Sequence, residues 1–186
     1  IETGSTIDYP SRRFVNAENA LLRIGHPDNW QTHGQGDAMT IVPQGGLVND
    51  GQGNQALAYG VIVNIFEPGG DAYGQQLQSR GYGQASTQNA ATRLEEATDR
   101  LVQELRLSNR NMRVIRNRES LQVDGARALS TFLSNDSPVG GRETDWLVTV
   151  AHEDGLLFMV FTAPEREVQI YDSTFQQMLR SVRIKR

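Results

Sequence analysis

The residues best suited to chemistry in this chain lie close together in a glycine-rich stretch near the N-terminus. Residues 25–37, GHPDNWQTHGQGD, contain His26 and His33, two of the three histidines, together with Asp28 and Asp37. Imidazole and carboxylate groups are ligands for zinc and iron, so this stretch is a candidate metal site. The histidines are seven residues apart, which matches neither the pairing of a helix face nor that of a strand face. We therefore expect no metal and no other cofactor in this chain.

The same stretch has a simpler structural interpretation as a corner between two elements. Pro27, Asp28 and Asn29 are typical turn residues, because proline fixes φ and Asp and Asn side chains hydrogen-bond to nearby backbone. We expect the chain to turn at Pro27 and to lay Trp30 against the core. In that arrangement the two histidines point apart.

The third histidine offers no catalytic motif. His152-Glu153 begins like the zinc-protease sequence H-E-x-x-H, but the second histidine is replaced by Leu156. Gly155 lies in a predicted hairpin turn, so no helix brings two imidazoles together, and we expect His152 at the surface at a strand end. Cysteine is absent, which excludes a thiol nucleophile and cysteine zinc ligands. The sequence therefore predicts no enzyme activity for this chain.

A second candidate site lies in the loop predicted over residues 137–146, SPVGGRETDW. Arg142, Glu143, Asp145 and Trp146 carry charge and aromatic surface, and they are the candidate binding surface if they line a groove. Alternatively, Trp146 is a core aromatic residue that begins its strand. Both interpretations stay open at this point.

Charge gives little indication of nucleic acid or membrane as a partner. The formal net charge is −4 with 22% charged residues, and no apolar run approaches the ~20 residues of a membrane-spanning helix. One local basic run stands out, Arg106, Arg110, Arg113, Arg116 and Arg118. No aromatic residues are interleaved for base stacking, so we interpret this run as a solvated face. We expect no nucleic-acid partner and no transmembrane segment.

Residues 51–56 match the dinucleotide pattern G-x-G-x-x-A, but they precede a strand instead of following one. The pattern binds pyrophosphate only where it leads from a strand into a helix. We expect a simple loop here.

Alternation of apolar and polar residues predicts strands through most of the chain. In the first half they are expected within residues 12–24, over 38–43 and over 56–68. The second half predicts about five strands, over residues 112–118, 120–125, 126–134 and, as a hairpin turning at Asp154-Gly155, over 144–164. Strands joined by direct hairpins favour an antiparallel sheet.

Two amphipathic helices accompany the strands. The first carries apolar residues at helical spacing, Leu94, Ala97, Leu101 and Leu105, and ends near Ser108-Asn109. The second covers residues 171–182. We therefore expect one α+β domain over residues 12–186, an antiparallel β-sheet flanked by two main helices. Residues 1–11 are expected to be a linker or processed N-terminus, and the Gly-, Gln- and Ser-rich residues 69–89 a flexible segment.

Two stretches resemble proteins of the PsbP-like fold. They are LLRIGHPDNWQ, a strand running into a Pro-x-x-Trp turn, and GLLFMVFTAPEREVQIYDSTFQQMLRSVRI, a late hairpin followed by a helix ending in Arg-Ser-Val. The resemblance implies an α/β/α sandwich built on an antiparallel sheet, in a group of proteins that is mostly non-enzymatic.

Several stretches also resemble the C-terminal region of bacterial envelope zinc metallopeptidases of the CAAX prenyl protease type. They are HPDNWQ, QALAYGVIVNIFEP, TDRLVQELRLSNRNMRV, ALSTFLSNDSPVGGRETDWLVTV and LLFMVFTAPERE. In such proteins the zinc and its H-E-x-x-H helix belong to a separate N-terminal domain, so no catalytic residue carries over.

The resemblances lead to one functional expectation and two alternatives. We expect a non-catalytic accessory or interaction domain of a secreted or envelope peptidase, located in the bacterial periplasm or cell envelope. Its partner would be its own peptidase domain or another envelope protein. The alternatives are a free-standing PsbP-like binding protein of the envelope, and a hydrolase that uses residues 137–146.

Overall fold

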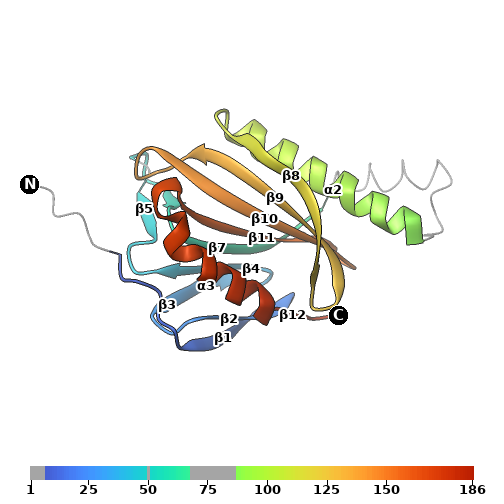
Figure 1. Ribbon diagram of the computed structural model, residues 1–186, viewed down its shortest axis with the longest axis horizontal. Coiled ribbons are helices and arrows are strands. Elements are labelled where there is room, and N and C mark those ends of the chain that lie inside the picture. The colour runs from blue at the N-terminus through green and yellow to red at the C-terminus, as the bar shows by residue number, and fades with distance from the viewer. Residues whose placement is uncertain (1–6, 50, 68–86) are drawn as a thin grey trace, which may run out of the picture.

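The computed structural model describes residues 7–49, 51–67 and 87–186 (Figure 1). The first half contains β1 (Phe14–Glu18), β2 (Leu22–Pro27), β3 (Trp30–Gln35), β4 (Ala38–Pro43), β5 (Leu47–Asn49), β6 (Gln55–Leu57) and β7 (Gly60–Phe66). The second half contains α2 (Thr87–Ser108), β8 (Arg113–Val123), β9 (Ala126–Asp136), β10 (Arg142–His152), β11 (Gly155–Pro164), the short helix η1 (Glu165–Glu167), α3 (Val168–Ser181) and β12 (Arg183–Ile184). The predicted α+β class with a mainly antiparallel sheet is confirmed.

A seven-stranded antiparallel sheet forms the centre of the structure, in the order β3-β4-β7-β11-β10-β9-β8. Its long strands follow one another through tight hairpins. Asp124 and Gly125 connect β8 to β9 with φ of 50° and 74°, the positive values that a two-residue type I′ turn requires. The β10–β11 hairpin pairs His152 with Gly155, so its turn residues are Glu153 and Asp154, one position earlier than predicted.

Alternation along these strands divides the core into two clusters on opposite sheet faces. Trp146 and Val148 lie on the face covered by α3, with Tyr171, Phe175 and Met178. Leu147, one residue along, joins the other cluster with Leu94 and Leu101 of α2. Figure 1 shows α3 in front of the sheet near β2 and α2 running along the β8 end. The two predicted helices therefore pack on the sheet from opposite sides.

The structure adds a smaller sheet that the simple two-helix description lacks. The strands β1, β2 and β12 form a three-stranded antiparallel sheet beside α3, and β5 and β6 form a two-stranded hairpin. The side chains of Leu22 and Ile24 in β2 are fully buried in the same cluster as α3. Thus α3 has apolar contacts on two sides, which fits a helix whose buried residues include Tyr171, Phe175 and Met178.

Two predictions of secondary structure were wrong. Residues 25–37, where no strand was expected, form the end of β2, a turn at Asp28 and Asn29, and β3. Residues 113–123 form one long strand with register shifts near Arg116, where two shorter strands were expected. The bulges interrupt the apolar alternation without ending the strand.

The predicted boundary segments are partly described. The prediction of a flexible segment over residues 69–89 lies mostly outside the described residues, and its last three residues already belong to α2. Of the predicted linker over residues 1–11, residues 7–11 are described and lie against the domain. The Asn29 side chain donates to the carbonyl of Tyr9 at 2.9 Å and accepts from the backbone N–H of Ser11 at 2.9 Å.

One buried polar contact joins α2 to the sheet and gives a stability prediction. The hydroxyls of Thr98 and Thr149 are 2.7 Å apart and both side chains are almost fully buried. Thr98→Val is expected to destabilise the fold by about 1–3 kcal/mol, because it leaves the Thr149 hydroxyl buried without a partner. The double variant T98V/T149V should recover most of that loss in urea unfolding. If the double variant lost about twice as much stability as Thr98→Val alone, this prediction would be contradicted.

Candidate functional site

The structure places the predicted binding residues on a strand and divides them between its two faces. Arg142, Glu143, Asp145 and Trp146 all belong to β10, so the predicted loop is confined to residues 137–141. Alternation sends Arg142 and Trp146 to the α3 side of the sheet and Glu143 and Asp145 to the α2 side. The four residues therefore cannot line one groove, and this part of the sequence interpretation was wrong.

Trp146 is a core residue, as the structural alternative predicted. Its side chain is 7% exposed, and its indole N–H donates to the hydroxyl of Ser130 at 2.8 Å. The ring stacks on Phe132 with 5.8 Å between centroids and contacts Phe161 at 5.0 Å. The satisfied N–H and the aromatic neighbours leave no surface for a ligand.

Arg142 connects the β9–β10 turn to the turn between α2 and β8. Its guanidinium donates to Asp136 at 2.9 Å, to the Ser134 hydroxyl at 3.0 Å and to the Asn111 carbonyl at 3.0 Å. The Asn111 amide also donates to Asp136 at 2.6 Å. These contacts lower the pKa of the Asp136 carboxyl, with the Asn111 hydrogen bond as the larger cause. Arg142 is thus committed to holding the β9–β10 turn against the turn between α2 and β8.

Glu143 and Asp145 form a buried carboxyl pair. They are 6% and 4% exposed and lie two residues apart on the same face of β10. Burial, followed by the nearby Asp145, raises the pKa of Glu143 from 4.5 to about 9. The pKa of Asp145 is also raised by burial, although hydrogen bonds from Thr162 and Glu143 oppose the rise. The Thr162 hydroxyl donates to Asp145 at 2.8 Å.

Burial and the nearby Asp145 favour the protonated form of Glu143. Glu143 Oε2 is buried without a hydrogen-bond partner among the described residues. Two ionised carboxylates only accept hydrogen bonds, so neither could donate to the other. A proton on Glu143 supplies the donor for a bond to Asp145. Such a pair resembles the acid–base dyads of enzymes, but a catalytic acid must reach its substrate, and these side chains lie within the packed α2 face.

The predicted corner is confirmed by the burial of Trp30. Its side chain is 3% exposed and contacts Tyr171 and Phe175 of α3, each with 6.2 Å between ring centroids. Pro27 ends β2 in the small sheet and Trp30 begins β3 in the large one, so the chain crosses between sheets here. The corner is therefore where the first sheet is joined to the second.

The three histidines are separated by this architecture. His26 is buried in the small sheet, with its Nδ1 2.8 Å from the Pro27 carbonyl, whereas His33 is exposed on β3. His152 ends β10, as predicted, but its side chain is only 5% exposed and lies 2.8 Å from the Lys185 carbonyl, so it is less exposed than expected. In the described ranges, no three His, Asp or Glu residues are grouped as metal ligands would be.

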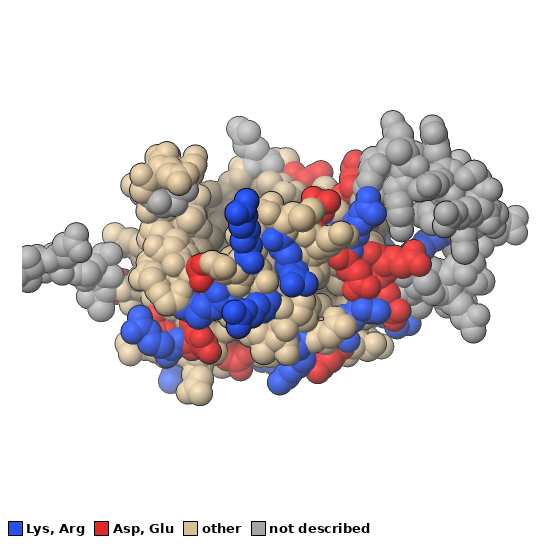
Figure 2. Space-filling view, turned by 90° about the horizontal axis from the view of Figure 1, so that it is seen from above, with Lys and Arg blue, Asp and Glu red and all other residues tan. Residues whose placement is uncertain are grey.

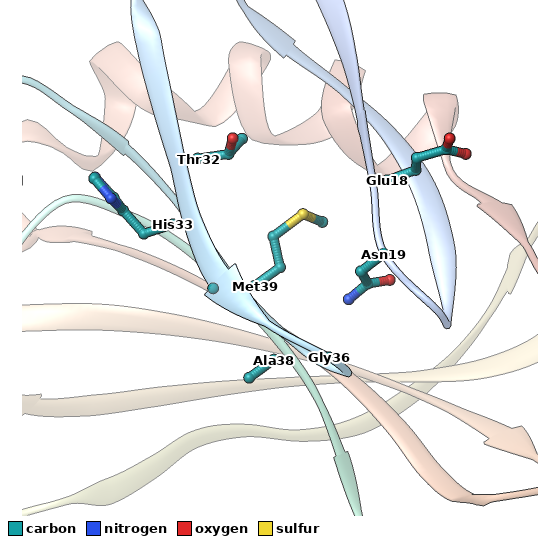
Figure 3. A pocket seen from close by; sticks show the side chains of 8 residues that line it. Glu18, Asn19, Thr32, His33, Gly36, Ala38 and Met39 are labelled. Carbon is teal, nitrogen blue, oxygen red and sulfur yellow. The ribbon is translucent and has the colours of Figure 1, made fainter.

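A hollow of about 240 Å³ lies between the β1–β2 turn and the β3–β4 hairpin (Figure 3). Glu18 and Asn19 border it on one side, and His33 and Met39 on the other. The Asn19 amide donates to the Asp37 carbonyl at 2.7 Å, which fixes the two turns relative to each other. Glu18 is paired with Lys185 at 3.1 Å. The hollow therefore contains no pair of groups placed to act on a substrate together.

The basic run is largely exposed, as the interpretation of a solvated face predicted. Figure 2 shows Lys and Arg side chains gathered on one face, with acidic side chains beside them. Arg118 is ion-paired with Asp99 at 2.9 Å and Glu95 at 3.8 Å. Arg106, Arg110 and Arg113 are exposed and have no ion pair within the described parts of the chain. The sequence contains a signal for these unpaired arginines, since no acidic residue lies between Arg106 and Glu119.

Comparisons with known proteins relate the chain to others through its fold. No family model matches the sequence, and no curated protein matches it. Among solved structures, the solution structure of cyanobacterial PsbP (CyanoP) from Synechocystis sp. PCC 6803 superposes with a TM-score of 0.56. That match has 13% sequence identity and covers 98% of this chain and 96% of the other.

The fold is PsbP-like. A protein of unknown function from Pseudomonas aeruginosa, PA94, described as a putative regulator, is also similar, with a TM-score of 0.48 and 11% identity over 94% of this chain and 98% of the other. The superposition on cyanobacterial PsbP confirms the resemblance to the PsbP-like fold, whereas the resemblance to a peptidase region finds no support in these comparisons. None of the described helices is long and apolar enough to cross a membrane.

Proposed function

We propose that this chain is a non-catalytic interaction domain with a PsbP-like fold that acts outside the cytoplasm. One contrast carries the proposal. The carboxyls of Glu143 and Asp145, whose pKa values are raised, are buried on the sheet and have almost no exposed surface for a substrate. Three exposed arginines at one end of the domain, by contrast, have no acidic partner among the described residues. Unneutralised surface charge favours binding of an oppositely charged partner.

The finer proposal is that the domain accompanies a secreted or envelope zinc metallopeptidase. The stretches similar to that peptidase region support it, and the zinc would then belong to a separate catalytic domain. The second version is a free-standing envelope binding protein, which the PsbP-like fold supports. The coding sequence upstream of Ile1 distinguishes them, since only the first version requires an H-E-x-x-H domain there.

Zinc analysis and a peptidase assay on the purified 186-residue chain test the non-catalytic proposal. We expect substoichiometric zinc after dialysis and no cleavage of an unfolded protein substrate such as casein. Stoichiometric zinc together with cleavage would overturn the proposal. A chelator-treated sample serves as the control for contaminating metallopeptidases.

A hydrolase remains the second candidate, and the adjacent carboxyls Glu143 and Asp145, whose pKa values are both raised by burial, favour it. This candidate requires that hydrolysis of a general ester or peptide substrate fall sharply in Glu143→Gln. If the chain is non-catalytic, any background hydrolysis is the same in Glu143→Gln and in the unmodified chain.

A further inference from the structure

A tight turn places the unpaired arginines at one end of the domain. Arg106 lies in the last turn of α2, Arg110 in the connection and Arg113 at the start of β8. Backbone hydrogen bonds from Asn109 N–H to the Arg106 carbonyl at 3.3 Å and from Met112 N–H to the Asn109 carbonyl at 3.0 Å keep this connection compact. The three positive charges therefore lie at the same end of the domain, and we call Arg106, Arg110 and Arg113 the arginine surface.

The neighbouring acidic groups do not neutralise the arginine surface. The oxygens of Asp136, at the β9–β10 turn, are already used by Arg142 and Asn111. Glu104 lies two residues before Arg106 in α2, but it forms no ion pair with the arginine surface. Glu95 and Asp99 are paired with Arg118. The three guanidiniums are therefore exposed without an ion pair among the described residues, and an anionic ligand would interact favourably with them.

Exposed aliphatic side chains lie at the same end. Leu107 is 70% exposed and Ile115 is 59% exposed, and they flank the arginine surface in sequence. Val139, 46% exposed, lies in the β9–β10 turn, which Arg142 and Asp136 tie to Asn111 in the α2–β8 connection. A single exposed aliphatic residue is normal. Arginine beside apolar side chains that lose water on binding, however, is typical of protein interfaces.

We propose that the arginine surface docks an acidic, extended segment of a partner protein that also carries aliphatic side chains. This inference rests on the proposed function, for which it names the partner's chemistry. The strand β8 is at the edge of the large sheet, but bulges near Arg116 disturb the ladder a partner strand would need. Recognition therefore relies on side chains, with the guanidiniums binding carboxylates and the aliphatic residues burying apolar surface.

Two other anionic partners fit the surface less well. A membrane is a broad anionic plane, and Figure 2 shows acidic side chains on the same face as the basic ones. The exposed Asp99 and Glu119 would meet that plane and oppose binding, whereas a narrow segment can avoid them. For single-stranded nucleic acid, none of the aromatic residues with described side chains is exposed at this end for base stacking.

A binding experiment with the full chain tests the inference. The probe is a fluorescein-labelled synthetic peptide of Glu and Asp with interspersed Leu, measured by fluorescence anisotropy. We expect the triple variant R106E/R110E/R113E to bind about tenfold or more weakly than the unmodified chain. The control R12E/R166E/R180E makes the same change in net charge on exposed arginines elsewhere and replaces the last-turn arginine of α3, matching Arg106 in α2. It should bind within about twofold of the unmodified chain.

Additional measurements separate the possible failures. Since Glu is unfavourable at a helix C-terminus, R106Q/R110Q/R113Q provides a milder variant that should also weaken binding. The double variant L107S/I115S should bind the Leu-containing peptide more weakly and bind an all-acidic peptide as well as the unmodified chain does. Equal losses in the two charge-reversed triples, or tighter binding to anionic phosphatidylserine vesicles or to single-stranded DNA, would overturn the inference. A peptide that stays intact but does not bind overturns this inference alone, whereas a cleaved peptide contradicts the proposed function.

Discussion

Glu143→Gln is expected to reduce the fall in the stability of this protein between about pH 5 and pH 9. In the folded chain the pKa of Glu143 is raised from 4.5 to about 9, mainly by burial and then by Asp145. The folded state therefore keeps a proton that the unfolded state releases. The stabilising contribution of this proton is fully present below pH 4.5 and is lost as the pH rises towards 9, by up to ~1.4 kcal/mol per pH unit. Glutamine is neutral throughout, so this loss disappears.

Urea unfolding of the two proteins at pH 5, 7 and 8.5 measures the effect. We expect similar free energies of unfolding at the lowest pH and a clear advantage for the variant at the highest. Glu153→Gln, on the exposed turn after β10, is the matched control and should keep the slope of the unmodified chain. Parallel curves for the unmodified chain and Glu143→Gln would show that the carboxyl pair does not share a proton.

Trp30→Ala is expected to cause the largest loss of stability, about 3–5 kcal/mol. The ring lies where the chain passes from the small sheet to the large one, against Tyr171 and Phe175 of α3. Its removal opens a cavity at the contact between both sheets and α3, which the surrounding backbone cannot close. Thermal unfolding by circular dichroism gives the measurement.

Two further variants control this prediction. Tyr9→Ala removes an aromatic ring that is 75% exposed and should change stability by less than about 0.5 kcal/mol. Trp30→Phe should lose much less than Trp30→Ala, because a ring still fills the site and the buried indole N–H, which has no partner among the described residues, is removed. If Trp30→Ala lost no more stability than Tyr9→Ala, the claim that Trp30 packs at the corner between the two sheets would be wrong.

Local patterns predicted the elements that have one apolar face and a clear terminator. Residues 38–43 form a strand with the predicted bounds, ended by Pro43, and the apolar spacing through Leu94 and Leu101 predicted the burial of that side of α2. The same patterns failed where strands are irregular. The bulged strand β8 loses its alternation near Arg116, and the glycines of residues 25–37 obscure the two strands on either side of the turn at Asp28 and Asn29.

The carboxyl pair was beyond local patterns for a physical reason. Charged residues in the stretch RETDW are typical of a solvated loop, and only pairing with Leu133 and Thr162 on neighbouring strands buries Asp145. A useful signal was nevertheless present. Glu143 and Asp145 continue the same alternation as Leu147 and Thr149, which places all four on one face of one strand. Strand assignment must therefore precede assignment of a binding surface.

Hydrogen–deuterium exchange of the full chain, with and without the acidic Leu-containing peptide, tests the central claim most directly. The account predicts slower exchange over residues 106–116, unchanged exchange over 142–146 and an intact peptide at the end of the experiment. Protection over residues 142–146 with cleavage of the peptide would contradict it, because the buried carboxyl pair would then be a catalytic site and the arginine surface a solvated face.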